Sequence, residues 1–190
     1  MDEIVGRSES GLSKVLLVVD AQEVFLRVND WHIPSFSGII ENISALANFF
    51  GGSTLFSKHV PPSTSAKGTW NDFYKNWNYI GSDATIWDIA TPLKGLKGTE
   101  FAKATYSCFG SPEFLNLIND TSHLVIAGVE TDCCVMATVL DAIDLGISIT
   151  VVTDAITSPS KIAHDGAIEF FKRVPLQVLT ATTEEILRST

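Results

Sequence analysis

The chain has 190 residues, of which 45% are hydrophobic and 18% are charged, and its formal net charge is −9. A chain of this length and apolar content can bury a sizeable core, so we expect one globular domain over residues 1–190 rather than a disordered protein. The acidic balance makes nucleic acid a poor partner, because a phosphate backbone requires a basic face.

We expect no targeting signal in the first residues of the chain. Residues 1–14 are polar and partly acidic, with no apolar segment of the kind found in a secretory signal, and we expect residues 1–13 to be flexible. No apolar run approaches the roughly 20 residues of a membrane span, so we expect no membrane partner. Three cysteines, two of them adjacent, suit a reducing compartment. We therefore expect a cytoplasmic protein.

Apolar runs and helical periodicity alternate along the chain. We expect strands over residues 15–19, 53–57, 101–105, 124–127, 147–152 and 176–179, and helices over residues 35–50, 82–90, 111–119, 132–145, 161–171 and 184–188. Alternating strands and helices imply right-handed crossovers and parallel pairing. The predicted fold is a three-layer, Rossmann-like α/β fold: a doubly wound, mostly parallel sheet with helices on both faces.

One segment departs from this alternation. Residues 60–80 are rich in Pro, Ser, Gly, Trp and Asn, and we interpret them as a functional loop, either a lid or an interface. Within them Trp70, Phe73, Tyr74 and Trp77 fall at near-helical spacing. These side chains would either pack on the body or a second subunit, or form an aromatic pocket wall.

Three side chains able to carry chemistry follow or end predicted strands. Asp20 follows the first, Lys103 belongs to the third, and Cys134 opens the helix after strand 124–127. The ends of neighbouring parallel strands converge on one crevice. A thiol at a helix start beside a lysine is expected to have a lowered pKa. An acid, a lysine and a thiol together would make a covalent hydrolase.

Taken singly, these residues also have ordinary structural interpretations. Cysteines are most often packed as small hydrophobes, an aspartate after a strand often caps a turn, and a lysine is usually solvated. Position alone does not choose between Cys133 and Cys134, which project about 100° apart on a helix.

Three motifs in order strengthen the functional interpretation. They are Asp-Ala-Gln-Glu-Val-Phe at 20–25, Lys-Ala-Thr-Tyr-Ser-Cys-Phe at 103–109 and Gly-Val-Glu-Thr-Asp-Cys-Cys-Val at 128–135. On these motifs the chain resembles the isochorismatase-like cysteine hydrolases, which include nicotinamidases, N-carbamoylsarcosine amidohydrolases and ureide-degrading amidases. The resemblance runs from about residue 15 to residue 179.

The resemblance implies a set of site residues. The catalytic residues would be Asp20, Lys103 and Cys134, because the family nucleophile directly precedes the valine of the third motif. The peptide between Val129 and Glu130 would be cis, and the backbone N–H groups of Glu130 and Cys134 would form an oxyanion hole.

Two subgroups of the family can be compared residue by residue. Nicotinamidases bind a metal through Asp-x-His and a second histidine, but here Ser57 stands where the aspartate should be and no second histidine appears before His123. We therefore expect no metal and no cofactor, and take His59 as a hydrogen-bonded residue near the cleft. True isochorismatases lack the nucleophilic cysteine, so Cys134 favours amide or ureide hydrolysis.

The predicted function is cleavage of the C–N bond of a small linear amide or ureide through a thioester. Isochorismatase-type vinyl ether hydrolysis, or a non-catalytic binding module on the same fold, are the alternatives. We expect five residues to bind substrate: Gln22, Phe25, Trp70, Trp77 and Tyr106. Arg27 could hold a substrate carboxylate. The resemblance also implies a homo-oligomer, a dimer or a tetramer.

Overall fold

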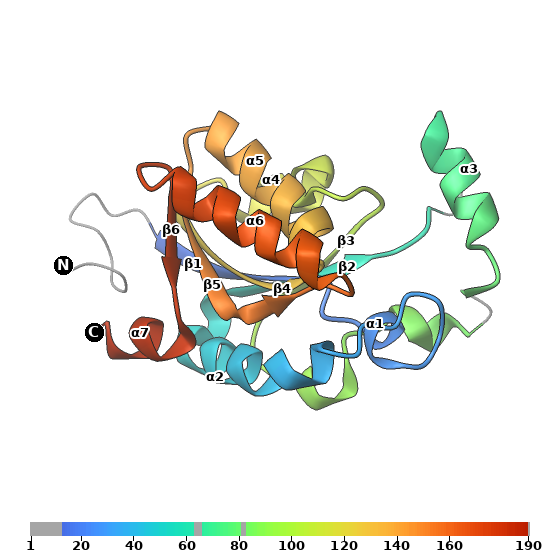
Figure 1. The fold of residues 1–190 in the computed structure, drawn as a ribbon, viewed down its shortest axis with the longest axis horizontal. Coiled ribbons are helices and arrows are strands. Elements are labelled where there is room, and N and C mark those ends of the chain that lie inside the picture. Colours follow the sequence, from blue (N-terminus) through green and yellow to red (C-terminus); the bar gives the residue numbers. More distant parts are fainter. Residues whose placement is uncertain (1–12, 63–65, 81–82, 190) are drawn as a thin grey trace.

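A six-stranded parallel sheet forms the centre of the computed structural model, which describes residues 13–62, 66–80 and 83–189 (Figure 1). The strands are β1 (Ser13–Val19), β2 (Thr54–His59), β3 (Thr99–Lys103), β4 (Thr121–Val129), β5 (Ser148–Thr157) and β6 (Val178–Ala181). Their order is β3-β2-β1-β4-β5-β6. The predicted α/β fold is confirmed. The expectation of a flexible segment over 1–13 falls outside the described residues, except that Ser13 begins β1.

The central strands are apolar because helices cover both of their faces. Leu16, Leu17, Val18 and Val19 of β1 are fully buried, which is typical of a strand inside a parallel sheet. The edge strand β3 instead alternates between exposed and buried side chains towards its end, where Phe101 and Lys103 point inward. Because of this alternation, the Lys103 side chain points into the interior of the protein.

Helices lie on both faces of the sheet (Figure 1). One face carries α2 (Ile40–Phe50) and α7 (Thr183–Arg188), and the other carries α4 (Pro112–Leu117), α5 (Met136–Asp144) and α6 (Lys161–Arg173). Each face buries its own hydrophobic cluster against the strands. In the part of the chain that is described, no helix is both long and apolar enough to cross a membrane.

Three local elements differ from the sequence-based expectation. The segment 60–80 contains a helix, α3 (Thr69–Asn76), so its aromatic spacing is helical; residues 63–65 are outside the described part. The helix expected over 82–90 is only a 3₁₀ turn, Ala84–Trp87, which the Asp83 side chain caps. A short helix, α1 (Glu23–Leu26), was not predicted, because four residues carry no readable period.

The chain order of the strands creates a crevice between β1 and β4. From β1 the chain builds outward through β2 and β3, then crosses back to place β4 on the other side of β1. Ligands bind in such sheets at this switch point, beyond the carboxyl ends of the strands. Gly128 lets the two strands approach there: its φ is +113°, and a Cβ on it would lie 2.0 Å from the Val19 carbonyl oxygen.

Candidate active site

Asp20 directly follows β1 and is fully buried. Its φ is +46°, a left-handed conformation that costs a non-glycine residue roughly 1–2 kcal/mol. Ser57 on β2 holds it in place: the Asp20 N–H donates to Ser57 Oγ at 2.9 Å, and the Ser57 hydroxyl donates to Asp20 Oδ1 at 2.6 Å. The second carboxylate oxygen, Oδ2, is left for Lys103.

Lys103, the last residue of β3, brings the acid and the thiol together. Its Nζ donates to Asp20 Oδ2 at 2.6 Å, to the Thr105 carbonyl at 3.0 Å and to Cys134 Sγ at 3.4 Å. These three contacts use all three donors of the ammonium group. Burial lowers the pKa of Lys103, but the Asp20 carboxylate and Cys134 more than offset it, so the pKa is raised and the side chain stays charged.

Cys134 lies in a π-helical turn, Thr131–Val135, that leads into α5. It is only 6% exposed. Burial, followed by the adjacent Asp20 carboxylate, raises the pKa of the Cys134 thiol well above its usual value, and the positive charge of Lys103 only partly opposes this. The expected lowering of this pKa is wrong for the resting site, because burial outweighs the helix start. The resting thiol therefore holds its proton beside Asp20.

The backbone before Cys134 has the conformation that the resemblance implies. The peptide bond between Val129 and Glu130 is cis. The N–H groups of Cys133 and Val135 both donate to the Glu130 carbonyl, each at 3.1 Å.

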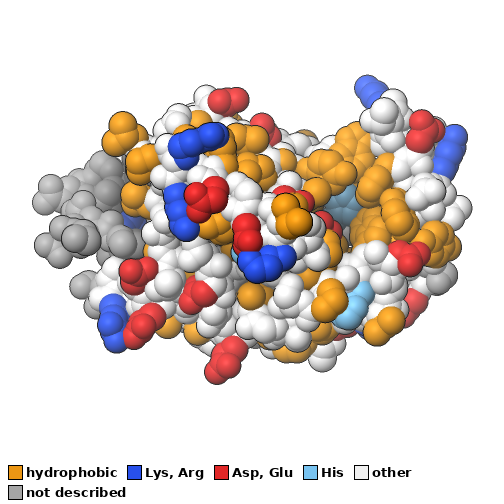
Figure 2. Space-filling view, in the orientation of Figure 1, with side chains coloured by type: hydrophobic (Ala, Val, Ile, Leu, Met, Phe, Trp, Pro, Cys, Tyr) orange, Lys and Arg blue, Asp and Glu red, His pale blue; other side chains and the backbone are white. Residues whose placement is uncertain are grey.

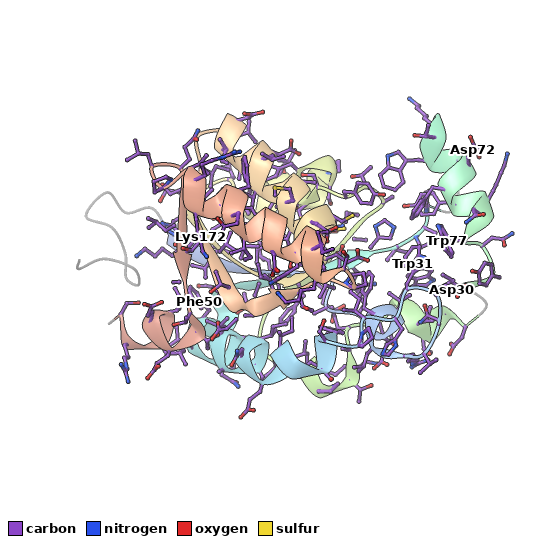
Figure 3. All side chains as sticks on the ribbon, in the orientation of Figure 1. Asp30, Trp31, Phe50, Asp72, Trp77 and Lys172 are labelled. Carbon is purple, nitrogen blue, oxygen red and sulfur yellow. The ribbon has the colours of Figure 1, made fainter. Side chains whose placement is uncertain are left out.

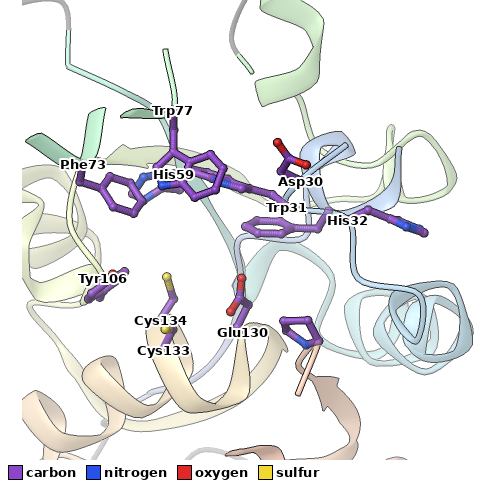
Figure 4. Close-up of a pocket in the computed structure, with 12 residues that line it drawn as sticks. Asp30, Trp31, His32, His59, Phe73, Trp77, Tyr106, Glu130, Cys133 and Cys134 are labelled. Atoms are coloured by element: carbon purple, nitrogen blue, oxygen red, sulfur yellow. The ribbon is translucent and has the colours of Figure 1, made fainter. Parts of the chain in front are cut away.

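A pocket of about 220 Å³ opens above Cys134 (Figure 4). Figure 2 shows the corresponding hollow, rimmed largely by hydrophobic side chains with a histidine inside it. Its lining combines aromatic rings, acidic side chains and the two adjacent cysteines: Phe25, Asp30, Trp31, His32, His59, Phe73, Trp77, Tyr106, Glu130, Cys133, Cys134 and Pro159. A cavity of this size suits a small molecule.

Trp31 is the centre of the aromatic wall. Its ring lies 5.7 Å from the ring of Phe73 and 6.0 Å from that of Trp77, both contributed by the α3 segment, and 6.1 Å from that of Phe25. In Figure 3, Asp30, Trp31 and Trp77 lie together beside α3, far from Lys172. Phe73 and Trp77 thus line the pocket, as the pocket-wall interpretation predicts, whereas Trp70 and Tyr74 pack on the body of the protein against Tyr106 and His59.

Three residues named from the sequence as ligand-binding lie elsewhere. Gln22 is fully buried, and its side-chain amide is used by the backbone of His59 and Trp87, so it joins β2 to a neighbouring turn. Trp70 packs behind the pocket against Tyr106, at 4.8 Å between rings. Arg27 pairs with two carboxylates, Glu23 at 3.0 Å and Asp83 at 2.9 Å, away from the pocket lining.

Sequence reasoning missed several residues of the site. Trp31 and Asp30 belong to a loop after α1 whose residues carry no periodic signal. Glu130 was named only for its backbone, although its side chain also lines the pocket. Ser57 was read only as a missing metal ligand. Ser57 lies near the carboxyl end of β2, the strand beside β1, and Asp20 directly follows β1. This placement was the signal from which the support of Asp20 by Ser57 could have been predicted.

An isochorismatase-domain family model matches residues 14–185. The chain belongs to the isochorismatase family. Isochorismatase domain-containing protein 2 of Xenopus laevis is 37% identical over 73 residues, which are 38% of this chain and 34% of that protein, so the match spans about a third of that relative.

Solved structures show the same fold. A cysteine hydrolase from Pseudomonas syringae pv. phaseolicola superposes with a TM-score of 0.79 at 19% identity, over 93% of this chain and 91% of that one. The zinc complex of the pyrazinamidase of Pyrococcus horikoshii gives a TM-score of 0.71 at 19% identity, over 89% of this chain and 98% of that one. The family and these structural neighbours are hydrolases, some of them amidases.

Because that neighbour binds zinc, the residues around His59 must be tested as a metal site. Ser57 is committed to Asp20, and rings of Trp31, Trp70 and Tyr74 surround the imidazole. Within 13–62, 66–80 and 83–189, no group of three or more His, Cys, Asp or Glu side chains is placed to hold a metal ion. This donor set does not fit zinc, and we derive no step through a metal.

The contacts at Cys134 predict opposite effects of two substitutions. Asp20→Asn removes the carboxylate that raises the pKa of Cys134, so alkylation by iodoacetamide should move to lower pH. Lys103→Met removes the charge that lowers this pKa, so alkylation should move to higher pH. Labelling rates against pH, followed by intact mass in a Cys133→Ala background, measure both shifts. Two shifts of the same sign would contradict this geometry.

Metal independence is a second prediction, motivated by the donor set at His59. Prolonged dialysis against a strong chelator should leave turnover unchanged, since no described residue group fits a metal. Activity lost on dialysis and restored by zinc, iron or manganese would refute the prediction.

Proposed function

We propose that this protein is a cysteine-dependent hydrolase that cleaves the C–N bond of a small linear amide or ureide through a thioester on Cys134. One observation carries the proposal: Lys103 Nζ lies 2.6 Å from Asp20 Oδ2 and 3.4 Å from Cys134 Sγ at the floor of a small pocket. An acid, a cation and a thiol in mutual contact are the parts that covalent hydrolysis requires.

In the first step, Asp20 acts as the general base. Sγ of Cys134 attacks the substrate carbonyl carbon while the thiol proton passes to the Asp20 carboxylate. The raised pKa of the thiol supports this order of events, because proton transfer then accompanies attack instead of preceding it. Lys103 keeps its positive charge throughout. It stabilises the negative charge first on the Asp20 carboxylate and then on the sulfur of Cys134.

Attack converts the carbonyl oxygen to an oxyanion. The backbone N–H groups of Glu130 and Cys134 are the proposed donors to it. Their position supports this assignment: Glu130 precedes, and Cys134 lies within, the turn between the carboxyl end of β4 and α5, where the helix start favours negative charge.

Collapse of the tetrahedral intermediate breaks the C–N bond. The protonated Asp20 gives its proton to the departing nitrogen, so that an amine or ammonia leaves and the acyl group stays on Sγ. A water molecule then attacks the thioester while Asp20 takes its proton. The acid is released, and Asp20 returns the proton to the sulfur.

The two alternative functions are each less well supported. Vinyl ether hydrolysis would not use a nucleophilic sulfur at the pocket floor. A non-catalytic binding module would have no need for a buried acid–lysine pair in contact with a thiol. Homo-oligomer formation, closure of the 60–80 segment over the site and a cytoplasmic location stay predictions.

The nucleophile assignment can be tested with a matched pair of cysteines. Cys134→Ala should reduce ammonia release from a panel of primary amides and ureides by at least about a thousandfold, because nothing else supplies the nucleophile. Cys133→Ala, at the adjacent pocket position, should keep most of the activity. Mass spectrometry of the wild-type chain during turnover should detect an acyl adduct on Cys134. The reverse pattern of losses would overturn the assignment.

A further inference from the structure

The pocket above Cys134 carries uncompensated negative charge. Glu130 and Asp30 both line it, whereas its described lining contains no lysine or arginine. The nearest cation, Lys103, lies beneath the floor and is matched by Asp20, with both side chains fully buried. The charges of the floor therefore cancel, and those of the wall do not.

Glu130 is the acidic group placed best to meet a ligand. Its carboxylate projects into the cavity between Cys134 and Trp31 (Figure 4). Within the described part of the chain, no side chain forms a hydrogen bond or an ion pair with it. Burial, and then the negative charges of Asp132 and Asp20, raise the pKa of Glu130 to about 7. A carboxylate in this state lacks a counterion, which a ligand could supply.

The histidines of the lining do not provide that counterion. Burial and the nearby Lys103 charge lower the pKa of His59 to about 4, so it is neutral at physiological pH. The imidazole of His32 points away from the cavity (Figure 4).

His59 is also held by a hydrogen bond behind the pocket wall. The Tyr74 hydroxyl donates to the Ala104 carbonyl at 2.6 Å, so at 3.2 Å it accepts from His59 Nε2–H. This leaves Nδ1 of the neutral ring as an acceptor, and it is a buried side-chain atom that no described group satisfies. The exposed acceptor of this wall is therefore the Glu130 carboxylate, which requires a hydrogen-bond donor that a nitrogen-rich ligand would bring.

The aromatic wall favours the same kind of ligand. The rings of Phe73 and Trp77 lie 5.7 Å and 6.0 Å from the ring of Trp31, on the side of the cavity facing Glu130. Tryptophan faces are the strongest aromatic partners for organic cations, and a carboxylate opposite them completes a cation site. A substrate carboxylate would meet like charge there and find no basic side chain.

We propose that the pocket selects substrates carrying a positively charged nitrogen group, an ammonium or a guanidinium, on the part that is not cleaved, with Glu130 as its counterion. The proposed function supplies the bond that is cleaved, and this part of the proposal rests on it. The preference of the pocket for a cationic ligand does not depend on it. The side chain of Glu130 would determine specificity and would take no part in the chemistry at sulfur, which involves only the backbone N–H of this residue.

Charge-matched thiol reagents test the proposal without requiring turnover. Methanethiosulfonates carrying a trimethylammonium, a sulfonate or a methyl group would be compared for their rates of Cys134 modification, in a Cys133→Ala background, at about pH 8.5, where Glu130 is ionised. The rate of each reagent with Cys134 is divided by the rate of the same reagent with a small uncharged thiol in solution, so that differences in intrinsic reactivity cancel. The cationic reagent should be favoured over the anionic one by about tenfold or more. Adding Cys134→Ala should abolish modification.

Variants then assign the preference to Glu130. Glu130→Gln should remove most of it, Glu130→Asp should keep it, and Glu113→Gln, an exposed control on α4, should change it by less than about twofold. Thermal unfolding would verify that each variant is folded. An anionic preference, or equal effects of Glu130→Gln and Glu113→Gln, would overturn the proposal. A Cys134 dispensable for turnover would sink the hydrolase mechanism while leaving this charge preference intact.

Discussion

The buried ion pair between Lys103 and Asp20 is the interaction on which the site depends. Its atoms are 2.6 Å apart and both side chains are fully buried. Such a pair is weak evidence for stability, because removing two charges from water costs several kcal/mol per ion, by an order-of-magnitude estimate. Asp20 also holds a left-handed backbone conformation. Asp20 therefore bears two unfavourable free energies, one from desolvation of its charge and one from its backbone conformation. Such costs on a residue beside a thiol are typical of a functional site and not of a stabilising one.

The ion pair also explains why the resting thiol is protonated. A helix start and a lysine would by themselves lower the pKa of Cys134, but the lysine's charge is shared with Asp20, and the sulfur is buried. The net result is a neutral S–H beside the Asp20 side chain, which pairs with Lys103. Under the proposed mechanism, such a thiol would resist oxidation and alkylation, which require thiolate, and would be activated only when a substrate carbonyl is in place.

The position of each site residue relative to the sheet decided whether the sequence could predict its role. Asp20, Lys103 and Cys134 come at strand ends or directly after them, so alternation and switch-point geometry were sufficient to expect that they meet. Burial was not readable in the same way, and the pKa of Cys134 was therefore assigned the wrong direction. Gln22 was misread because its amide spans to His59 and Trp87, contacts between segments far apart in the chain. Trp31, in the loop after α1, and the side chain of Glu130, directly after β4, could be assigned to the pocket only from the three-dimensional structure.

The site thus has two parts with different structural origins. The floor is built from strand ends, whose relative positions are set by the register of β1 with β2 and β4 and cannot shift without unpairing the sheet. The wall comes from the loop after α1 and from α3, neither of which contributes a strand to the sheet. Glu130 is the exception, since it follows β4 directly and is fixed as firmly as the nucleophile four residues later. A counterion at that position would hold a ligand nitrogen at a constant distance from Sγ whatever the wall does. The wall would then exclude water and set the size of the ligand, while Glu130 would set its charge and its register against the attacking sulfur.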